Sequence, residues 1–163
     1  METYLKQLYE KYNKSYFDGL LPGISSQRVM IQLSRRLTAT GGFCRRVSWG
    51  RDYKYILTLS HHYLERFPED VENLLLHEMI HILVRGHGQG FQRWMAYINS
   101  FGIHQVNVHA KGRAKKPEYK WLYICPNGAC DLHIVKKTVK RYPNDGQGYA
   151  CKKCRTQIVQ RRI

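Results

Sequence analysis

Long apolar runs and an excess of acidic residues are both absent from this sequence. No segment approaches the roughly 18 apolar residues that span a bilayer, and residues 1–17 lack the apolar core of a signal peptide. We therefore expect a soluble intracellular chain, cytoplasmic and nucleoid-associated in a prokaryote or nuclear in a eukaryote. Internal repeats are lacking too. The 163 residues, with 43% hydrophobic side chains, suffice for one compact domain with a small appendix.

The shortage of acidic residues leaves a large positive charge. Lys and Arg number 27 against 12 Asp and Glu, a net charge of +15. Residues 1–104 hold 13 basic and 9 acidic residues, whereas residues 105–163 hold 14 and 3. This concentration indicates a polyanionic partner, and nucleic acid is favoured over an anionic membrane because no basic amphipathic helix is visible. A solvated basic face without a partner is the alternative.

Cysteine is sparse but clustered, and four of the five cysteines lie near the C-terminus: Cys125, Cys130, Cys151 and Cys154. Their C-x4-C and C-x2-C pairs are close to the two knuckles of a zinc ribbon. Disulfides are a weaker explanation without a secretion signal. We predict a structural zinc site with four thiolate ligands. His133 is an alternative ligand, and Cys44 is interpreted as a small buried hydrophobe.

Apolar periodicity predicts three helices. Apolar and aromatic side chains recur with a helical period in residues 3–17 and 90–100. Pro68 and the acidic pair after it mark the start of the third helix, which we expect to end near Gly86.

Four further segments are typical of strands: residues 28–34, 41–47, 53–60 and 103–109. Together with the helices they predict an α+β fold with a small, mainly antiparallel sheet packed on helices. We expect this domain to cover residues 1–110, followed by a basic linker at 111–118 and the four-cysteine ribbon at 119–163.

The segment "LLLHEMIHILVRGHGQGF", residues 74–91, carries the strongest chemical signal. On a helix His77 and His81 are one turn apart, so both imidazoles project from one face and can bind one metal ion. Glu78 completes the pattern H-E-x-x-H, in which the carboxylate serves as a general base. Each histidine alone would more often be structural, and a non-catalytic metal site would not need Glu78.

A third ligand is predicted from the end of the same helix. Gly86 allows the backbone to reverse, which would bring His87 back towards the metal ion. Three protein ligands leave one position open for water, as a hydrolytic zinc site requires.

These motifs, in their order along the chain, resemble the SprT-like metalloproteases, the group that includes Spartan-type proteases acting on DNA-protein crosslinks. The matching stretches are "YNKSYFDGLLP", "QLSRRLTATGGFC", "LTLSHHYL", "LLLHEMIH", "GHGQGFQRWMAYINS" and the C-terminal ribbon. The resemblance implies a zincin-like protease domain with His77, His81 and His87 as ligands of the catalytic zinc and Glu78 as general base. The longer "CPNGAC" knuckle departs from the common two-residue gap, and the sequence is similar to a minimal form with a protease domain plus ribbon.

The resemblance also implies a function. We expect a monomeric, DNA-dependent zinc metalloendopeptidase of low sequence specificity, with one catalytic and one structural Zn²⁺ ion. Its partners would be DNA, single-stranded or with single-stranded features, and proteins bound or crosslinked to DNA. The predicted phosphate-binding residues are Lys111, Arg113, Lys115, Lys116, Lys136, Lys137, Lys140, Arg141, Lys152, Lys153 and Arg155. The candidate base-stacking side chains, each also a candidate for the ribbon core, are Trp121, Tyr123, Tyr142 and Tyr149.

Two other classes of protein remain open. One is a nucleic-acid-binding zinc protein without protease activity, and the other is a metal-dependent endoribonuclease with a similar three-histidine spacing. The glutamate after the first histidine argues against both, because neither requires a general base at that position.

Overall fold

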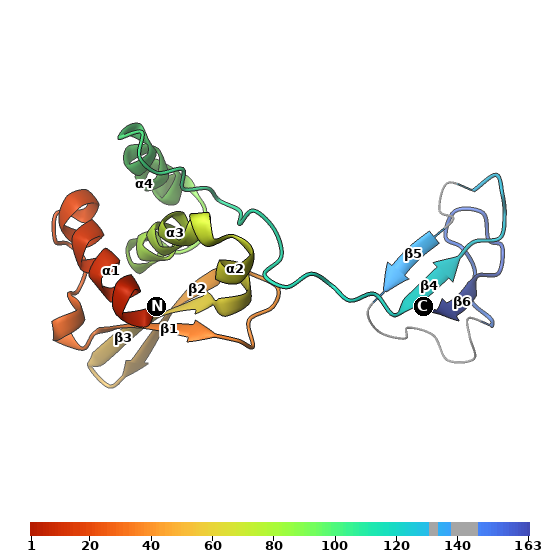
Figure 1. Cartoon of the computed structure of the whole chain (residues 1–163), viewed down its shortest axis with the longest axis horizontal. Coiled ribbons are helices and arrows are strands. Elements are labelled where there is room, and N and C mark those ends of the chain that lie inside the picture. The colour runs from red at the N-terminus through yellow and green to blue at the C-terminus, as the bar shows by residue number, and fades with distance from the viewer. Residues whose placement is uncertain (131–133, 138–146) are drawn as a thin grey trace. The chain divides into compact units, whose positions relative to one another are not determined.

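The computed structural model describes residues 1–130, 134–137 and 147–163. The chain forms two compact units, Met1–Lys115 and Lys116–Ile163, each with its own sheet (Figure 1). Within the described part of the chain, no helix is long and apolar enough to cross a membrane.

A three-stranded sheet is the base of the first unit. It consists of β1 (Val29–Ser34), β2 (Gly42–Trp49) and β3 (Asp52–Ser60), in the order β1-β3-β2. β2 and β3 form an antiparallel hairpin, but β1 runs parallel to β3. The sheet is therefore mixed: the predicted antiparallel pairing holds for β2 and β3, and the parallel pairing of β1 was not predicted. The apolar end of β3, where Leu57 and Leu59 are fully buried, takes the central position, so β1 pairs with β3 rather than with β2.

Four α-helices complete the first unit: α1 (Glu2–Phe17), α2 (His61–Arg66), α3 (Val71–Leu83) and α4 (Gln89–Ser100). Figure 1 shows α1 and α3 on one face of the sheet. Their apolar faces meet the sheet in one core that includes Leu5, Tyr9, Phe17, Leu75, Leu76 and Met79. Each such side chain stabilises the fold by about 1.5–3 kcal/mol on burial. Pro68 starts a short 3₁₀ turn, Pro68–Asp70, which leads into α3.

The predicted strand at residues 103–109 is wrong, because this segment has no strand pairing. Side-chain amides, instead of a neighbouring strand, form hydrogen bonds with the backbone of this segment. Asn99 donates from Nδ2 to the carbonyl of Val106 and accepts the Val106 N–H, at 2.9 and 2.8 Å. The N–H of Gln105 donates to Oδ1 of Asn73 on α3. The alternating pattern thus reflects a segment held against helices.

Residues 111–115 belong to the first unit rather than to a free linker. The N–H of Lys111 donates to the Tyr63 hydroxyl, and the N–H of Lys115 donates to the carbonyl of Thr38. Ala114 is buried between these two anchors. The basic composition of this stretch concealed these backbone contacts, so the expected linker at 111–118 is corrected to begin after residue 115.

The second unit is built on a smaller sheet. β4 (Trp121–Ile124) pairs antiparallel with both β5 (Ile134–Lys137) and β6 (Val159–Arg162). Cys125, Cys130 and Cys151 form its buried cluster, with Cys154 and Ile158 packed against them. Among the described residues of this unit the cluster is small, so apolar burial there provides little to hold the unit together.

Candidate metal centres

Helix α3 carries the H-E-x-x-H residues on a rigid, buried support. Leu75, Leu76 and Met79 are fully buried, so the helix cannot rotate without exposing them. The helical part ends at Leu83, after which Val84 is extended and its N–H donates to the carbonyl of Ile80. His77 and His81 therefore keep a fixed position on one face.

His87 reaches the same point in space from the loop after α3. Gly86 has a φ of +68°, a left-handed conformation that glycine adopts at little cost, and the chain reverses there. The Nε2 atoms of His77, His81 and His87 then lie 3.1–3.2 Å from one another. The prediction that Gly86 turns the chain so that His87 joins the pair agrees with this geometry.

Backbone carbonyls fix the orientation of two of these imidazoles. Nδ1 of His77 lies 2.7 Å from the Asn107 carbonyl, and Nδ1 of His81 lies 3.1 Å from the Val84 carbonyl. A carbonyl only accepts, so each Nδ1 carries the proton and donates it. The Nε2 atoms of the two rings consequently face one another. Burial, reinforced by the neighbouring histidines, lowers the pKa of His77 to about 4 and keeps this ring neutral at pH 7.

The triangle of nitrogens fits a zinc ion. Zn–N bonds of about 2.0–2.1 Å in a tetrahedron place nitrogens about 3.3 Å apart, close to the observed 3.1–3.2 Å. Three imidazole nitrogens that converge in this way are a common ligand set for zinc. Phe91 of α4 supports all three rings, with centroid distances of 4.8 Å to His77, 4.9 Å to His81 and 4.7 Å to His87.

Glu78 is a buried carboxyl beside the histidine triangle. Only 3% of the residue is exposed, and its Oε2 has no hydrogen-bond partner among the residues that the structure describes. Gly42 of β2 lies so close that an added β-carbon would come 2.8 Å from Oε1. Burial raises the pKa of Glu78 to about 8, which suits a group that gains and loses a proton near neutral pH.

Two clefts meet at this centre and share Gly42, His77, Glu78 and His87. The first, of about 370 Å³, extends from the centre along residues 105–113 and is called the 105–113 cleft here. The second, of about 830 Å³, runs between β2 and residues 82–87 and is called the arginine cleft here, because Arg45, Arg46 and Arg85 line it. A chain that crosses both clefts would therefore pass over Glu78.

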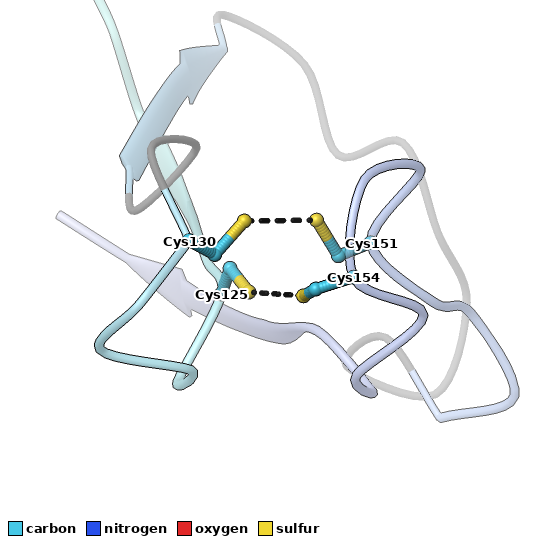
Figure 2. Close-up of side chains that lie close together, drawn as sticks. All are labelled: Cys125, Cys130, Cys151 and Cys154. Atoms are coloured by element: carbon cyan, nitrogen blue, oxygen red, sulfur yellow. Dashed lines mark hydrogen bonds between the residues drawn. The ribbon is translucent and has the colours of Figure 1, made fainter.

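The four predicted cysteine ligands also converge (Figure 2). The Sγ atoms of Cys125 and Cys154 are 3.4 Å apart, and those of Cys130 and Cys151 are 3.6 Å apart. A tetrahedral zinc with bonds of about 2.3 Å would hold sulfurs about 3.8 Å apart, so these thiols fit such an ion. The donor set, four sulfurs and no open position, is that of a structural site.

Local hydrogen bonds shape both knuckles. In the longer one, the N–H of Cys130 donates to the carbonyl of Asn127, so the extra residues form a tight turn. In the shorter one, Arg155 adopts a φ of +62°. Hydrogen bonds with the hydroxyl and the backbone of Thr156 lower the pKa of Cys154 to about 6, and the hydroxyl has the largest effect. The lower pKa favours the thiolate, which is the form that binds zinc.

The predicted phosphate-binding residues are divided between the two units. Lys111, Arg113 and Lys115 lie in the first unit, and the ammonium of Lys111 is 3.0 Å from a Glu69 carboxylate oxygen. Of the predicted phosphate-binding residues in the second unit, Lys116, Lys152, Lys153 and Arg155 are exposed. Lys136 and Lys137 lie in β5, where the structure describes the backbone alone. The remaining basic residues, Lys140 and Arg141, fall outside the described residues, as do His133 and Tyr142.

The aromatic candidates in the ribbon differ in exposure. Tyr123 is 7% exposed and belongs to the interior, whereas Trp121 is half-buried and Tyr149 is 40% exposed. Tyr149 is therefore better placed than Tyr123 for stacking on an unpaired base.

Sequence reasoning missed several residues that build the catalytic centre. The carbonyls of Asn107 and Val84 give no signal in a sequence, because every residue has a carbonyl. Phe91 was recognised only as an apolar helix position, and Gly42 only as part of a strand. Their roles depend on contacts between segments that are distant in the chain.

Comparisons with known proteins agree with this geometry. A family model described as the SprT-like family matches residues 5–112. The DNA-dependent metalloprotease SPRTN of Xenopus tropicalis is 28% identical over 155 residues, covering 86% of this chain and 34% of that protein. SPRTN of Homo sapiens is also 28% identical over 155 residues, with 86% of this chain and 30% of that protein covered. The chain thus spans about a third of the length of these relatives. No solved structure gives a significant match.

Proposed function

The chain belongs to the SprT-like family, and on that premise we propose that it is a DNA-dependent zinc endopeptidase that cleaves DNA-bound or DNA-crosslinked proteins. The single observation that carries this proposal is the triangle of Nε2 atoms from His77, His81 and His87 beside the buried carboxyl of Glu78. Metal ligands, an open coordination position and a general base are the parts that peptide hydrolysis requires.

The three histidines would hold the catalytic zinc through Nε2. When bound there, zinc polarises a carbonyl oxygen and makes a water molecule more acidic. The hydrogen bonds from His77 to Asn107 and from His81 to Val84 keep the rings aligned, so little reorganisation is needed on metal binding.

Glu78 would move the proton. Its unpartnered Oε2 accepts a proton from the attacking water and then delivers it to the amine that leaves when the peptide bond breaks. The other carboxyl oxygen would lie against β2, where Gly42 leaves room for it.

β2 would bind the substrate backbone. It is an edge strand in the order β1-β3-β2, and Gly42 at its start lies against Glu78. An extended peptide could pair with this edge through backbone hydrogen bonds, which depend little on side-chain identity. Low sequence specificity follows from this mode of binding.

DNA would control the activity through the basic ribbon. The relatives are named DNA-dependent metalloproteases, and this chain carries its strongest positive charge after residue 104. The exposed Lys152, Lys153 and Arg155 lie on the knuckle next to the structural zinc ligands, where they can neutralise phosphates.

A direct experiment uses the zinc-loaded full chain and a DNA-binding substrate such as a histone, with and without single-stranded DNA. We expect cleavage only when DNA is present, and none by the Glu78→Gln variant with its zinc retained. Absence of cleavage under every condition would favour a nucleic-acid-binding zinc protein. Cleavage of RNA that persists in Glu78→Gln would favour an endoribonuclease.

A further inference from the structure

The arginine cleft has positive charge on both of its walls. Arg45 and Arg46 belong to β2, and Arg85 belongs to the loop between α3 and His87. All three are exposed. Within the residues that the structure describes, none of them forms an ion pair with a carboxylate. Of the described residues that line the cleft, Glu78 alone carries a carboxyl, and it is buried at the inner end. The cleft therefore presents uncompensated positive charge to an incoming chain.

The 105–113 cleft differs in this respect. Two basic residues, Lys111 and Arg113, line it, and two carboxylates offset their charge: Glu69 and Asp70 lie 3.0 and 3.8 Å from the Lys111 ammonium. The two sides of the catalytic centre are thus electrostatically unequal. A substrate that crosses the centre meets net positive charge on the β2 side alone.

Arg46 lies four residues along β2 from Gly42. Side chains of a strand alternate between faces, so Arg46 lies on the same face of β2 as Gly42, which contacts Glu78. Four residues of a strand span about 13 Å. The guanidinium carbon of Arg46 lies 4.5 Å from the centre of the Tyr53 ring, a cation–π contact that restrains the side chain while leaving its charge available.

We propose that the arginine cleft is a subsite for acidic side chains, and that Arg46 and Arg85 make the enzyme prefer Asp or Glu three to four residues from the scissile bond. This preference rests on the proposed peptidase function and deepens it. Backbone pairing with β2 fixes the alignment of the substrate, and the two arginines select the side chain at one substrate position. The other positions accept many side chains. The preferred cleavage positions are then acidic segments of DNA-associated proteins.

A peptide fits this cleft better than a nucleic acid strand does. Apolar Phe43, Ile82 and Val84 line it together with the arginines, so it offers contacts to side chains as well as to charge. The edge of β2 also supplies backbone donors and acceptors along its length. Nucleic acid would use the charge but leave these strand groups without partners.

The test measures binding as well as cleavage. Zinc-loaded full-length Glu78→Gln is titrated with two fluorescent peptides that differ only by Glu or Gln at one position, and the glutamate is then moved along the peptide. We expect binding about ten-fold tighter with glutamate at one preferred position, roughly three- to five-fold per arginine, which is the range of exposed ion pairs. Arg46→Gln and Arg85→Gln in this background should remove the difference. Arg51→Gln, an exposed arginine at the tip of the same hairpin, should preserve it.

The outcomes separate this inference from the proposed function. Equal binding of the two peptides, or a preference that does not depend on position, would overturn the acidic subsite even if the wild-type chain cleaves both. Binding discrimination without cleavage by the wild-type chain would support the subsite and contradict the peptidase. If Arg46→Gln and Arg85→Gln weaken binding of an oligothymidylate but leave the peptide difference intact, the cleft binds nucleic acid and the inference is wrong.

Discussion

Glu78 and Gly42 are in direct contact, although they belong to different elements, because a β-carbon on Gly42 would fall 2.8 Å from Oε1 of Glu78. The same β-carbon would come 3.1 Å from the carbonyl oxygen of Thr58, which is backbone and cannot rotate away. The absence of a side chain at Gly42 thus allows Glu78, the proposed general base, to lie against the edge strand that would carry substrate.

The first prediction is that Gly42→Ala lowers both stability and activity. The crowded methyl group must displace the carboxyl or the strand, which we expect to cost about 1–3 kcal/mol of unfolding free energy. Denaturant unfolding and peptidase assays measure the two effects. Gly23→Ala is the matched control, since its added carbon would meet only ordinary contacts at 3.5 Å or more. Equal losses in the two variants would show that the contact at Gly42 is not special.

The second prediction concerns the general base. Glu78→Gln keeps the size of the side chain but cannot accept a proton from water, so we expect peptidase activity to fall by about 10²–10⁴-fold. Metal analysis should show the same zinc content as the wild type, since the three histidines are unchanged. Residual activity near the wild-type level would assign the proton transfer to another group.

The third prediction is that chelation affects the two units differently. The ribbon has a small buried cluster made mostly of its cysteines, so removal of zinc should unfold residues 116–163. The first unit has a large apolar core and should stay folded. Amide hydrogen exchange, measured with and without a strong chelator, reports the folding of each unit separately. Protection of β4 and β6 that survives complete zinc removal would contradict this expectation.

The fourth prediction links stability to the protonation of His104. This residue is 6% exposed and packs on Tyr12, with ring centroids 5.1 Å apart. Burial lowers its pKa from 6.5 and outweighs the nearby Glu72, which raises it. Below pH 6.5 the unfolded chain binds the proton more readily than the folded chain, so stability falls as the pH decreases.

The measurement is the melting temperature from pH 7.5 to pH 5.5 for the zinc-loaded wild type and for His104→Gln. We expect a shallower decline in the variant, because glutamine does not titrate. The comparison cancels the contribution of the metal-binding histidines, which both proteins share. An equal decline of the melting temperature with pH in both proteins would show that protonation of His104 does not cause the pH dependence of stability.

The fifth prediction concerns the ribbon and DNA. Substituting Lys152, Lys153 and Arg155 by glutamine should weaken binding to single-stranded DNA at low salt. The slope of log K against log salt should also become shallower, by about 0.7 for each phosphate that the protein no longer neutralises. Lys14→Gln on the exposed side of α1 is the control. An unchanged slope in the triple variant would place the phosphate-binding groups elsewhere.

Much of the candidate metal centre was predictable from the sequence, because it depends on short-range spacing. The four-residue interval between His77 and His81 puts both rings on one helical face wherever the helix lies. Gly86 before His87 indicated a reversal, and it has the left-handed φ that such a reversal uses. The cysteine spacing likewise predicted a cluster of thiols, and the four Sγ atoms lie within 4.8 Å of one another.

Errors arose where a local pattern had more than one tertiary explanation. Residues 103–109 alternate like a strand, but Asn99 and Asn73 satisfy their backbone groups in place of a neighbouring strand. The direction of β1 relative to β3 was not predictable either, since a strand pattern does not specify its partner. Residues 111–115 have the composition of a linker, yet Tyr63 and Thr38 bind their backbone.

The sequence by itself determined the candidate metal ligands, because their spacing along a helix and within two knuckles is a local property of the chain. Only the tertiary structure decided what surrounds those groups. It placed Gly42 against Glu78, aimed the Asn107 carbonyl at His77 and set Arg46 and Arg85 on opposite walls of one cleft. These contacts join residues that are distant in the chain, so they follow from the packing of the core and from no local pattern.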